Sequence, residues 1–288
     1  MKNSKYWFGF FVGPILIAFL MVVIIPALLG IYYSFTDWNG IVNDANWVGL
    51  RNYIDIFTKD KDFLNAFLFT AKFAFVSVIT INIMGFGLAL LVTKGMKMSN
   101  VLRSIFFMPN LIGGLILGFV WQFIFTKAFD TVGVNYGIAF LEGWLSTPAT
   151  GFWGLVILMS WQLAGYMMVI YIAALENVPE SLKEAAEIDG ASPWQKLFHI
   201  TIPLVTPAFT VGMFLTLSNS FKLFDQNLAL TNGGPFKSTQ MLALNIYSTA
   251  FTFNRLGLAQ AKAVIFLITV AVITLTQLSY NKKREVEM

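Results

Sequence analysis

Long uncharged apolar runs alternate with short polar segments along the whole chain. Six runs lack Asp, Glu, Lys and Arg and reach the roughly 18 residues that a helix needs to cross a bilayer. They are Trp7–Phe35, Phe73–Thr93, Ser104–Thr126, Ala149–Leu175, Ile200–Phe221 and Ala263–Tyr280. This pattern predicts an all-α integral membrane protein with six transmembrane helices and no acidic residue inside a span.

The polar segment between the fourth and fifth runs predicts a helix, a hinge and a second helix. Residues 180–189 are good helix formers, and Gly190 can adopt the left-handed turn that ends a helix. Ser192 then suits an N-cap, and Gln195 three residues later completes a capping box. The small side chains of Ala185 and Ala186 would let a partner approach closely.

The same segment has a characteristic spacing. Glu184-Ala185-Ala186 is followed by three residues, Gly190, nine residues and the Ile-x-Ile-Pro of 200–203. This resembles the cytoplasmic loop by which permease subunits of binding-protein-dependent ABC importers dock on their ATPase. The resemblance implies the type-1 ABC importer transmembrane fold, with cytoplasmic coupling helices between spans 4 and 5. It assigns the ATPase contact to Glu184, Ala185, Ala186, Asp189 and Gly190. Ile202 stands where the family prefers Leu, and an ordinary amphipathic loop is the alternative.

A second motif follows the fifth apolar run. Leu230-Thr231-Asn232-Gly233-Gly234-Pro235 predicts a tight turn, with two glycines free to take positive φ. After a fifth span it resembles the Leu-Thr-x-Gly-Gly-Pro segment of sugar-importing permeases of the maltose-permease type. The resemblance extends over roughly residues 65–280. We therefore expect an N-terminal helix and external loop at 1–64, a transmembrane domain at 65–280 and a cytoplasmic tail at 281–288.

Composition and charge agree with a membrane protein. Only 12% of residues are charged, against about 25% in a typical soluble domain, and the net charge of +4 needs no nucleic-acid partner. The apolar N-terminal run is too long for a signal peptide and predicts a first span. Two short segments carry basic residues and no acidic ones, which predicts that they lie on the cytoplasmic side. Their residues are Lys94, Lys97, Arg103, Lys282, Lys283 and Arg284. Six spans then place both termini in the cytoplasm.

Catalytic and metal-binding motifs are missing from the sequence. It has no phosphate-binding Gly-x4-Gly-Lys-Ser/Thr loop, no cysteine and a single histidine, His199. A solvated loop histidine is the simplest interpretation of His199. We expect a transporter subunit with no cofactor and no metal, whose ATP hydrolysis takes place on a separate subunit.

Large polar side chains inside spans are costly unless they face a cavity or a partner. Asn110, Gln162, Tyr166, Asn219 and Ser220 combine amides and hydroxyls with aromatic rings, which suits a neutral polyhydroxylated ligand. By resemblance to maltose-type permeases they fall on cavity-lining stretches. Hydrogen bonds between helices are the alternative for each of them. Asn82 and Gln277 are interpreted as packing or interfacial residues, and Asp225 is close enough in sequence to pair with Lys222.

The sequence therefore predicts a permease subunit in a bacterial inner membrane that imports a sugar, most simply an oligosaccharide. The expected partners are a second homologous permease subunit, two ATPase subunits and an external solute-binding protein. A permease for glycerol phosphate or a polyamine is the alternative within this class. An ion-coupled secondary transporter would need buried carboxylates that the predicted spans lack, and a structural membrane protein would not explain the docking motif.

Overall fold

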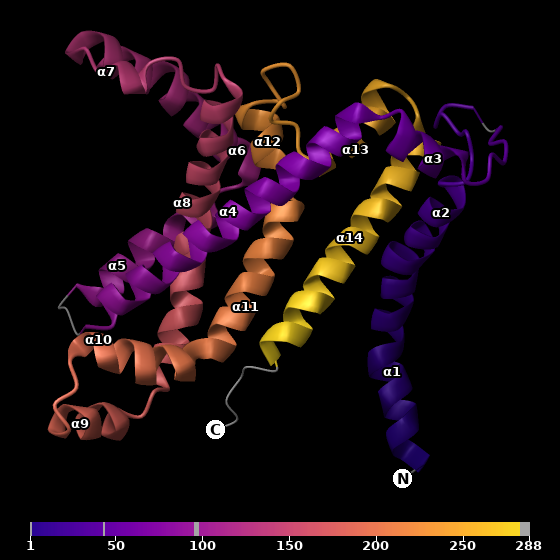
Figure 1. The fold of residues 1–288 in the computed structure, drawn as a ribbon. Helices are drawn as coiled ribbons and strands as arrows, with labels where there is room; N and C mark the ends of the chain where they lie inside the picture. The colour runs from indigo at the N-terminus through magenta and orange to yellow at the C-terminus, as the bar shows by residue number, and fades with distance from the viewer. Residues whose placement is uncertain (1, 43, 95–97, 283–288) are drawn as a thin grey trace. The chain divides into compact units, whose positions relative to one another are not determined.

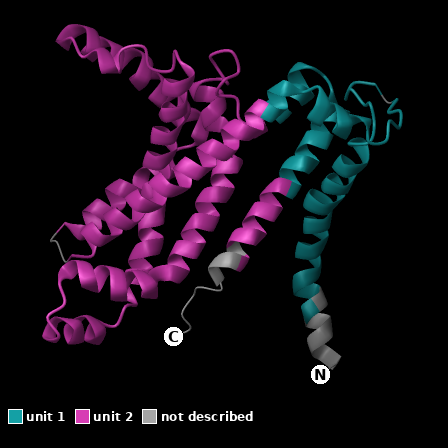
Figure 2. Ribbon diagram, in the orientation of Figure 1, with its two compact units in different colours: residues 1–64, 245–268 teal, residues 65–244, 269–288 magenta. Residues whose placement is uncertain are grey.

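The structure is a computed structural model that describes residues 2–42, 44–94 and 98–282. These residues form helices and loops, with one isolated bridge between Thr36 and Trp47 (Figure 1). The chain divides into two compact units: unit 1 comprises residues 1–64 and 245–268, and unit 2 comprises 65–244 and 269–288 (Figure 2). The predicted boundaries at 64 and 280 remain a prediction.

The helices fall into three groups along the chain. The first group is α1 Lys2–Phe19, π-helix η1 Leu20–Ile24, α2 Ile25–Tyr33, α3 Arg51–Thr58, α4 Lys61–Val92, α5 Ser99–Phe107 and 3₁₀-helix η2 Met108–Leu111. The second is α6 Gly114–Phe123, π-helix η3 Ile124–Ala128, α7 Phe129–Tyr136, 3₁₀-helix η4 Ala139–Leu141 and α8 Pro148–Glu176. The third is α9 Glu180–Ile188, α10 Pro193–Lys196, π-helix η5 Leu197–Thr201, α11 Ile202–Phe221, α12 Asp225–Leu230, α13 Leu242–Tyr247, π-helix η6 Ser248–Thr252 and α14 Leu256–Lys282.

Six helical stretches of the described residues are long and apolar enough to cross a membrane. They are Phe10–Tyr33, Lys61–Val92, Gly114–Tyr136, Pro148–Glu176, Pro193–Phe221 and Leu256–Gln277. The predicted number of spans and the all-α class are confirmed. The bounds differ because helices continue past charged residues, which end an apolar run in the sequence but not a helix.

The third span differs most from its prediction. The run Ser104–Thr126 is not one helix: α5 ends at Phe107, and η2 leads to Ile112 and Gly113 in extended conformation before α6 begins. Pro109, which lacks a backbone N–H, lies in this break and favours it. The candidate span is Gly114–Tyr136 instead.

The expectation that no acidic residue lies inside a span is wrong for the observed helices. Asp130 lies within the third stretch, where its carboxylate accepts a hydrogen bond from the Gly143 N–H at 2.8 Å. Asp62 lies in the first turn of α4, and Glu176 is the last residue of α8. Each of these charges is close to the end of its helix.

The core of unit 2 is built around α8, in which 72% of an apolar 18-residue window is buried within the structure. Glycines allow close helix contacts there. A Cβ added to Gly165 would lie 1.7 Å from the Phe106 carbonyl oxygen, so α5 crosses α8 at backbone distance. A Cβ on Gly118 would lie 2.5 Å from that of Ala229, which brings α12 against α6. The first contact holds the end of α5, next to the break, against α8.

Unit 1 contains a buried charge pair. The Lys262 ammonium lies 2.8 Å from the Asp60 carboxylate and donates to Asn245 Oδ1 at 2.8 Å and to Thr249 Oγ1 at 2.7 Å. The Lys262 side chain is 3% exposed. A buried ammonium is stable only when acceptors surround it in this way, so the pair belongs to the scaffold of unit 1.

Some predicted features lie outside the described residues. Lys97, Lys283 and Arg284, which supported the predicted orientation, are among them, as are residues 283–288 of the predicted tail.

Candidate functional site

The segment between α8 and α11 has the predicted helix, hinge and helix. α9 ends at Ile188, and Gly190 follows with φ of +79°. The Ala191 N–H donates to the Ala186 carbonyl at 2.9 Å, which closes the turn as in a Schellman motif. Space is open around Gly190, because a Cβ there would meet nothing within 4 Å. Glycine is therefore needed for its backbone conformation.

The second helix of this segment starts with the predicted capping box. Ser192 Oγ accepts from the Gln195 N–H at 3.3 Å, and the Ser192 N–H donates to Gln195 Oε1 at 2.7 Å. An ion pair between Lys196 and Glu187 joins α10 to α9. The hydrogen bond from the Lys196 ammonium, followed by its charge, lowers the pKa of the Glu187 carboxyl. The two short helices are thus joined by side chains as well as by the turn.

The exposed surface of this segment combines small and polar side chains with large apolar ones. Glu184, Ala185 and Asp189 are exposed, and Ala186 is half-buried. Large apolar side chains are exposed beside them: Ile188 at 87%, Trp194 at 69% and Phe198 at 56%. The Trp194 and Phe198 rings stack at 5.9 Å. The sequence motif identified the alanines, whereas these apolar neighbours were missed because each looks like an ordinary residue of an amphipathic helix.

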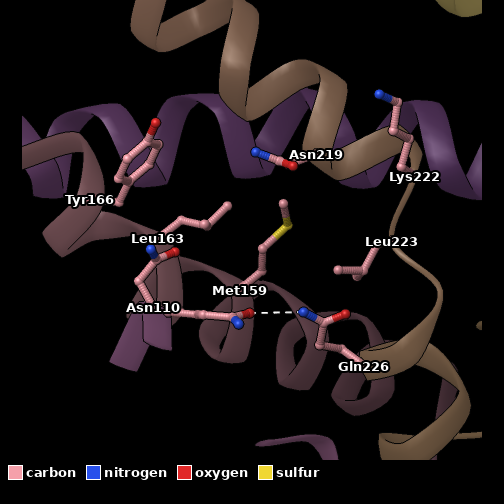
Figure 3. A pocket seen from close by; sticks show the side chains of 9 residues that line it. Asn110, Met159, Leu163, Tyr166, Asn219, Lys222, Leu223 and Gln226 are labelled. Atoms are coloured by element: carbon pink, nitrogen blue, oxygen red, sulfur yellow. Dashed lines mark hydrogen bonds between the residues drawn. The ribbon is translucent and has the colours of Figure 1, made fainter. Parts of the chain in front are cut away.

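A cavity of about 290 Å³ lies in unit 2 between η2, α8, α11 and the segment that starts α12 (Figure 3). It is lined by Asn110, Met159, Gln162, Leu163, Tyr166, Asn219, Lys222, Leu223 and Gln226. Four of the five sequence-predicted residues are therefore together: Asn110, Gln162, Tyr166 and Asn219. They come from three separate helices, of which η2 is the break in the third predicted span.

The polar side chains of the cavity differ in their bonding. Asn110, Tyr166, Asn219 and Lys222 have no side-chain hydrogen bond to another described residue. Gln162 is already engaged: it donates to the Ile112 carbonyl at 3.3 Å and accepts from Gln226 Nε2 at 2.8 Å. An amide can make more bonds than these. The cavity thus presents two amides, a phenol and an amine that are open to a ligand.

Ser220 is the predicted residue that does not line the cavity. Its side chain is fully buried, donates to the Thr216 carbonyl at 2.7 Å and lies 3.7 Å from the Met159 sulfur. Ser220 follows Asn219 directly, so on α11 it points about 100° away from it. The structure places Ser220 in the packing between α11 and α8.

The residues interpreted as packing residues make contacts between helices. Asn82 donates to Thr216 Oγ1 at 3.0 Å and accepts from the Tyr171 hydroxyl at 2.5 Å, which ties α4 to α11 and α8. Gln277 donates to the Thr210 carbonyl at 3.4 Å. Asn82 is 4% exposed, so its amide is part of the interior.

Two polar cavity residues were not assigned from the sequence. Gln226 lies in the first turn of α12, beyond the predicted fifth span, and no local pattern distinguished it. Lys222 was considered as an ion-pair partner of Asp225, yet it lines the cavity and no ion pair joins the two in the described part of the chain. The signal for Lys222 was its place one residue after the last apolar position of α11.

His199 and the glycine turn complete the predicted motifs. The exposed His199 has Nδ1 3.1 Å from the Gln195 carbonyl oxygen, and no group of metal-binding side chains occurs among the described residues. In the turn after α12, positive φ falls on Asn232 and Gly233 and not on both glycines. Asn227 Nδ2 donates to the Thr239 carbonyl at 2.8 Å and holds this turn against α12.

A family model matches residues 81–284, well over half of the chain, and its description is binding-protein-dependent transport system inner membrane component. The chain belongs to this family. It is 53% identical, over 100% of its length and 99% of the relative's, to the probable starch degradation products transport system permease protein AmyD of Thermoanaerobacterium thermosulfurigenes. It is 30% identical, over 98% of each chain, to the multiple sugar-binding transport system permease protein MsmF of Streptococcus mutans.

A solved structure supports the fold. The crystal structure of a bacterial ABC transporter involved in the import of the acidic polysaccharide alginate contains a chain with a TM-score of 0.85 and 20% sequence identity, covering 98% of this chain and 96% of that one. The predicted family resemblance and the type-1 ABC importer transmembrane fold are confirmed. The chain is a multi-pass membrane permease component and not an enzyme.

Proposed function

We propose that this chain takes up a sugar, most simply a neutral oligosaccharide, as one permease subunit of an ATP-driven importer. The observation that carries the proposal is the cavity of unit 2, in which Asn110, Tyr166 and Asn219 are open to a ligand. Amide and phenol groups both donate to and accept from sugar hydroxyls. The permease relatives named for starch degradation products and for multiple sugars support this class of substrate.

The charge of the cavity favours a neutral sugar over the alternatives. Its lining contains one charged side chain, Lys222, and no carboxylate. A cationic polyamine would lack a counter-charge there. A phosphate ester could use Lys222, but the remaining polar groups are uncharged and suit hydroxyls better. Lys222 can donate to a sugar oxygen without requiring an anion.

The partners follow from the docking segment. We assign the ATPase contact to Glu184, Ala185, Ala186, Asp189 and Gly190, whose side chains are small or exposed. Ile188, Trp194 and Phe198 are exposed apolar groups that such a contact would cover. One docking segment serves one ATPase subunit, so a second permease subunit, a second ATPase subunit and an external solute-binding protein complete the importer.

The length of α8 supports the orientation. Its 29 residues rise about 43 Å, more than the roughly 30 Å of a bilayer's apolar core. The docking segment after its C-terminus and the loop before Thr147 then lie on opposite sides of the membrane. With the docking segment in the cytoplasm of a bacterial cell, both termini are cytoplasmic and the 222–261 segment is external.

The mechanism is a change between two states that expose the cavity to opposite sides. ATP-driven closure of the ATPase pair would move α9 and α10, and the turn at Gly190 together with the Lys196–Glu187 pair would pass this movement on to α11. Because α11 carries Asn219, its shift would change access to the cavity. Each state is favoured by a different ligand, ATP or its hydrolysis products.

The test uses the permease reconstituted in vesicles with its partner permease, the ATPase and the binding protein, with maltotriose as the probe. Ala185→Trp should abolish ATP-driven uptake, because a large ring cannot fit a close interface, and Gly190→Pro should do the same because proline cannot adopt φ of +79°. Ala139→Trp is the matched control, since Ala139 is also exposed but lies outside the docking segment. Normal uptake by both docking variants would contradict the docking assignment. Uptake driven by a proton or sodium gradient without the ATPase would overturn the importer itself.

A further inference from the structure

A second polar cavity of about 290 Å³ lies in unit 1, far along the sequence from the first. Its walls come from the loop after α2, from α3 and from the turn that precedes α14. The residues that matter are Asp37, Trp38, Asn39, Arg51, Asp55 and Arg255. They lie within residues 36–62 and 222–261, and the orientation proposed above places 222–261 outside the membrane.

The bonding of these side chains leaves groups open to a ligand. Asn39 Oδ1 accepts from the Ile41 N–H at 2.9 Å and the Val42 N–H at 3.2 Å, so its amide nitrogen remains a donor. Arg255 is exposed and has no hydrogen bond or ion pair of its side chain to another described residue. Its guanidinium offers five N–H donors in a planar fork.

An aromatic ring forms part of the wall. The Trp38 indole stacks on Tyr33 with ring centres 4.4 Å apart, and its Nε1 donates to the Val42 carbonyl at 2.7 Å. These contacts hold the ring in place before any ligand arrives, so binding loses little side-chain entropy. A fixed aromatic ring beside amide and guanidinium donors is suited to the apolar face of a pyranose ring.

The balance of positive and negative side chains in this cavity favours a neutral ligand. Two arginines, Arg51 and Arg255, face two aspartates, Asp37 and Asp55. Arg51 lies 4.0 Å from Asp55, and Asp55 also pairs with Lys59 at 2.6 Å. Asp37 accepts from the Asn46 backbone N–H at 2.9 Å. A carboxylate from a partner protein would meet both aspartates, whereas a neutral polyol can accept from the arginines and donate to the free carboxylate lone pairs.

We infer that this cavity is a second sugar-binding site, which takes one ring of a neutral oligosaccharide on the external side of the membrane. The inference rests on the proposed function for its orientation and substrate class. It adds a site in unit 1 that is separate in its residues from the cavity of unit 2. Arg255 and Asn39 are its donors, and Trp38 is its stacking surface.

The test is photoaffinity labelling of the assembled permease complex with an aryl-azide derivative of maltotriose, without ATP and without the binding protein. Labelled peptides are mapped by mass spectrometry, with free maltotriose as competitor. We expect competed labelling at residues 36–58 or 253–262, reduced about tenfold by Arg255→Gln at subsaturating probe, since a hydrogen bond from a charged donor is lost. Lys61→Gln removes another exposed cation of unit 1 outside the cavity and should leave the labelling unchanged.

The remaining outcomes distinguish this sugar site from the alternative interpretations of the cavity. Labelling that free maltotriose does not reduce, or that Arg255→Gln leaves unchanged, overturns the inference. Competition by a trigalacturonate that is stronger than by maltotriose overturns the argument for a neutral ligand. Weaker binding of the solute-binding protein to Arg255→Gln with unchanged labelling would make the cavity a protein contact instead. If maltotriose competes for labelling of this cavity but the complex transports no sugar, the proposed function is contradicted and this second site is still supported.

Discussion

Two polar clusters in unit 2 use the same pair of helices and have opposite properties. In the first, Tyr171 of α8 and Thr216 of α11 bond to Asn82 of α4. In the second, Tyr166 of α8 and Asn219 of α11 line the cavity and bond to no described residue. Five residues turn a helix by about 140°, so the two tyrosines of α8 face different surroundings. Residue types alone therefore do not distinguish a packing cluster from a binding site.

The two clusters differ in the partners of their hydrogen bonds. A buried polar group without a partner costs about 1–3 kcal/mol, so the interior keeps Asn82 only because its oxygen and nitrogen are both satisfied. Asn110, Tyr166, Asn219 and Lys222 of the cavity are exposed or half-buried, so water can bond to them until a ligand replaces it. Removing a member of the first cluster should therefore damage the protein, and removing a member of the second should damage transport.

The largest expected effect is that of Asn82→Ala. The change leaves the fully buried Tyr171 hydroxyl without its acceptor, which should cost about 1–3 kcal/mol of stability. The void left by the removed amide group adds to this cost. Thermal unfolding of the purified complex should begin earlier, and less complex should reach the membrane. Uptake per assembled complex should be unchanged. The double variant Asn82→Ala/Tyr171→Phe should recover part of the loss, because no unpaired hydroxyl remains; no recovery would argue against this bonding.

The next effect is that of Asn219→Ala in the open cluster. Loss of one neutral hydrogen bond to the sugar, worth about 0.5–1.5 kcal/mol, should lower normalised uptake by up to about tenfold. Thermal stability should stay at the wild-type value, because Asn219 bonds to no described residue. Ser220→Ala is the adjacent control: its hydroxyl bonds to the Thr216 carbonyl and not into the cavity, so uptake should not change. If Asn219→Ala lowered stability and left normalised uptake intact, the two clusters would not differ in kind.

The smallest effect is expected for Gln226→Ala, which sharpens the boundary between the clusters. Gln226 donates to Gln162 and lines the cavity, so it has both properties. Its removal frees the Gln162 oxygen, which water can reach, and we expect uptake to fall a few-fold with a stability loss below about 1 kcal/mol. Measuring uptake and thermal unfolding on the same preparation gives the loss of transport and the loss of stability together. A stability loss as large as that of Asn82→Ala would move Gln162 and Gln226 into the scaffold.

Features that depend on local patterns could be predicted from the sequence. Uncharged apolar runs predicted six spans, because a bilayer requires about 18 apolar residues whatever the helices pack against. The capping box at Ser192 and the left-handed turn at Gly190 also depend on a few adjacent residues. Pro109 was visible in the sequence, but whether it breaks a helix or kinks it depends on what packs there, and the third span was predicted wrongly.

Which polar groups find a hydrogen-bond partner depends on how the helices pack. Ser220 and Asn219 are neighbours in sequence, yet one is packed against α8 and the other faces the cavity. Gln162 and Gln226 are 64 residues apart and bond to each other. A polar side chain at membrane depth needs a partner, and the sequence shows the need but not the partner, because the helices that supply it are brought together only by packing.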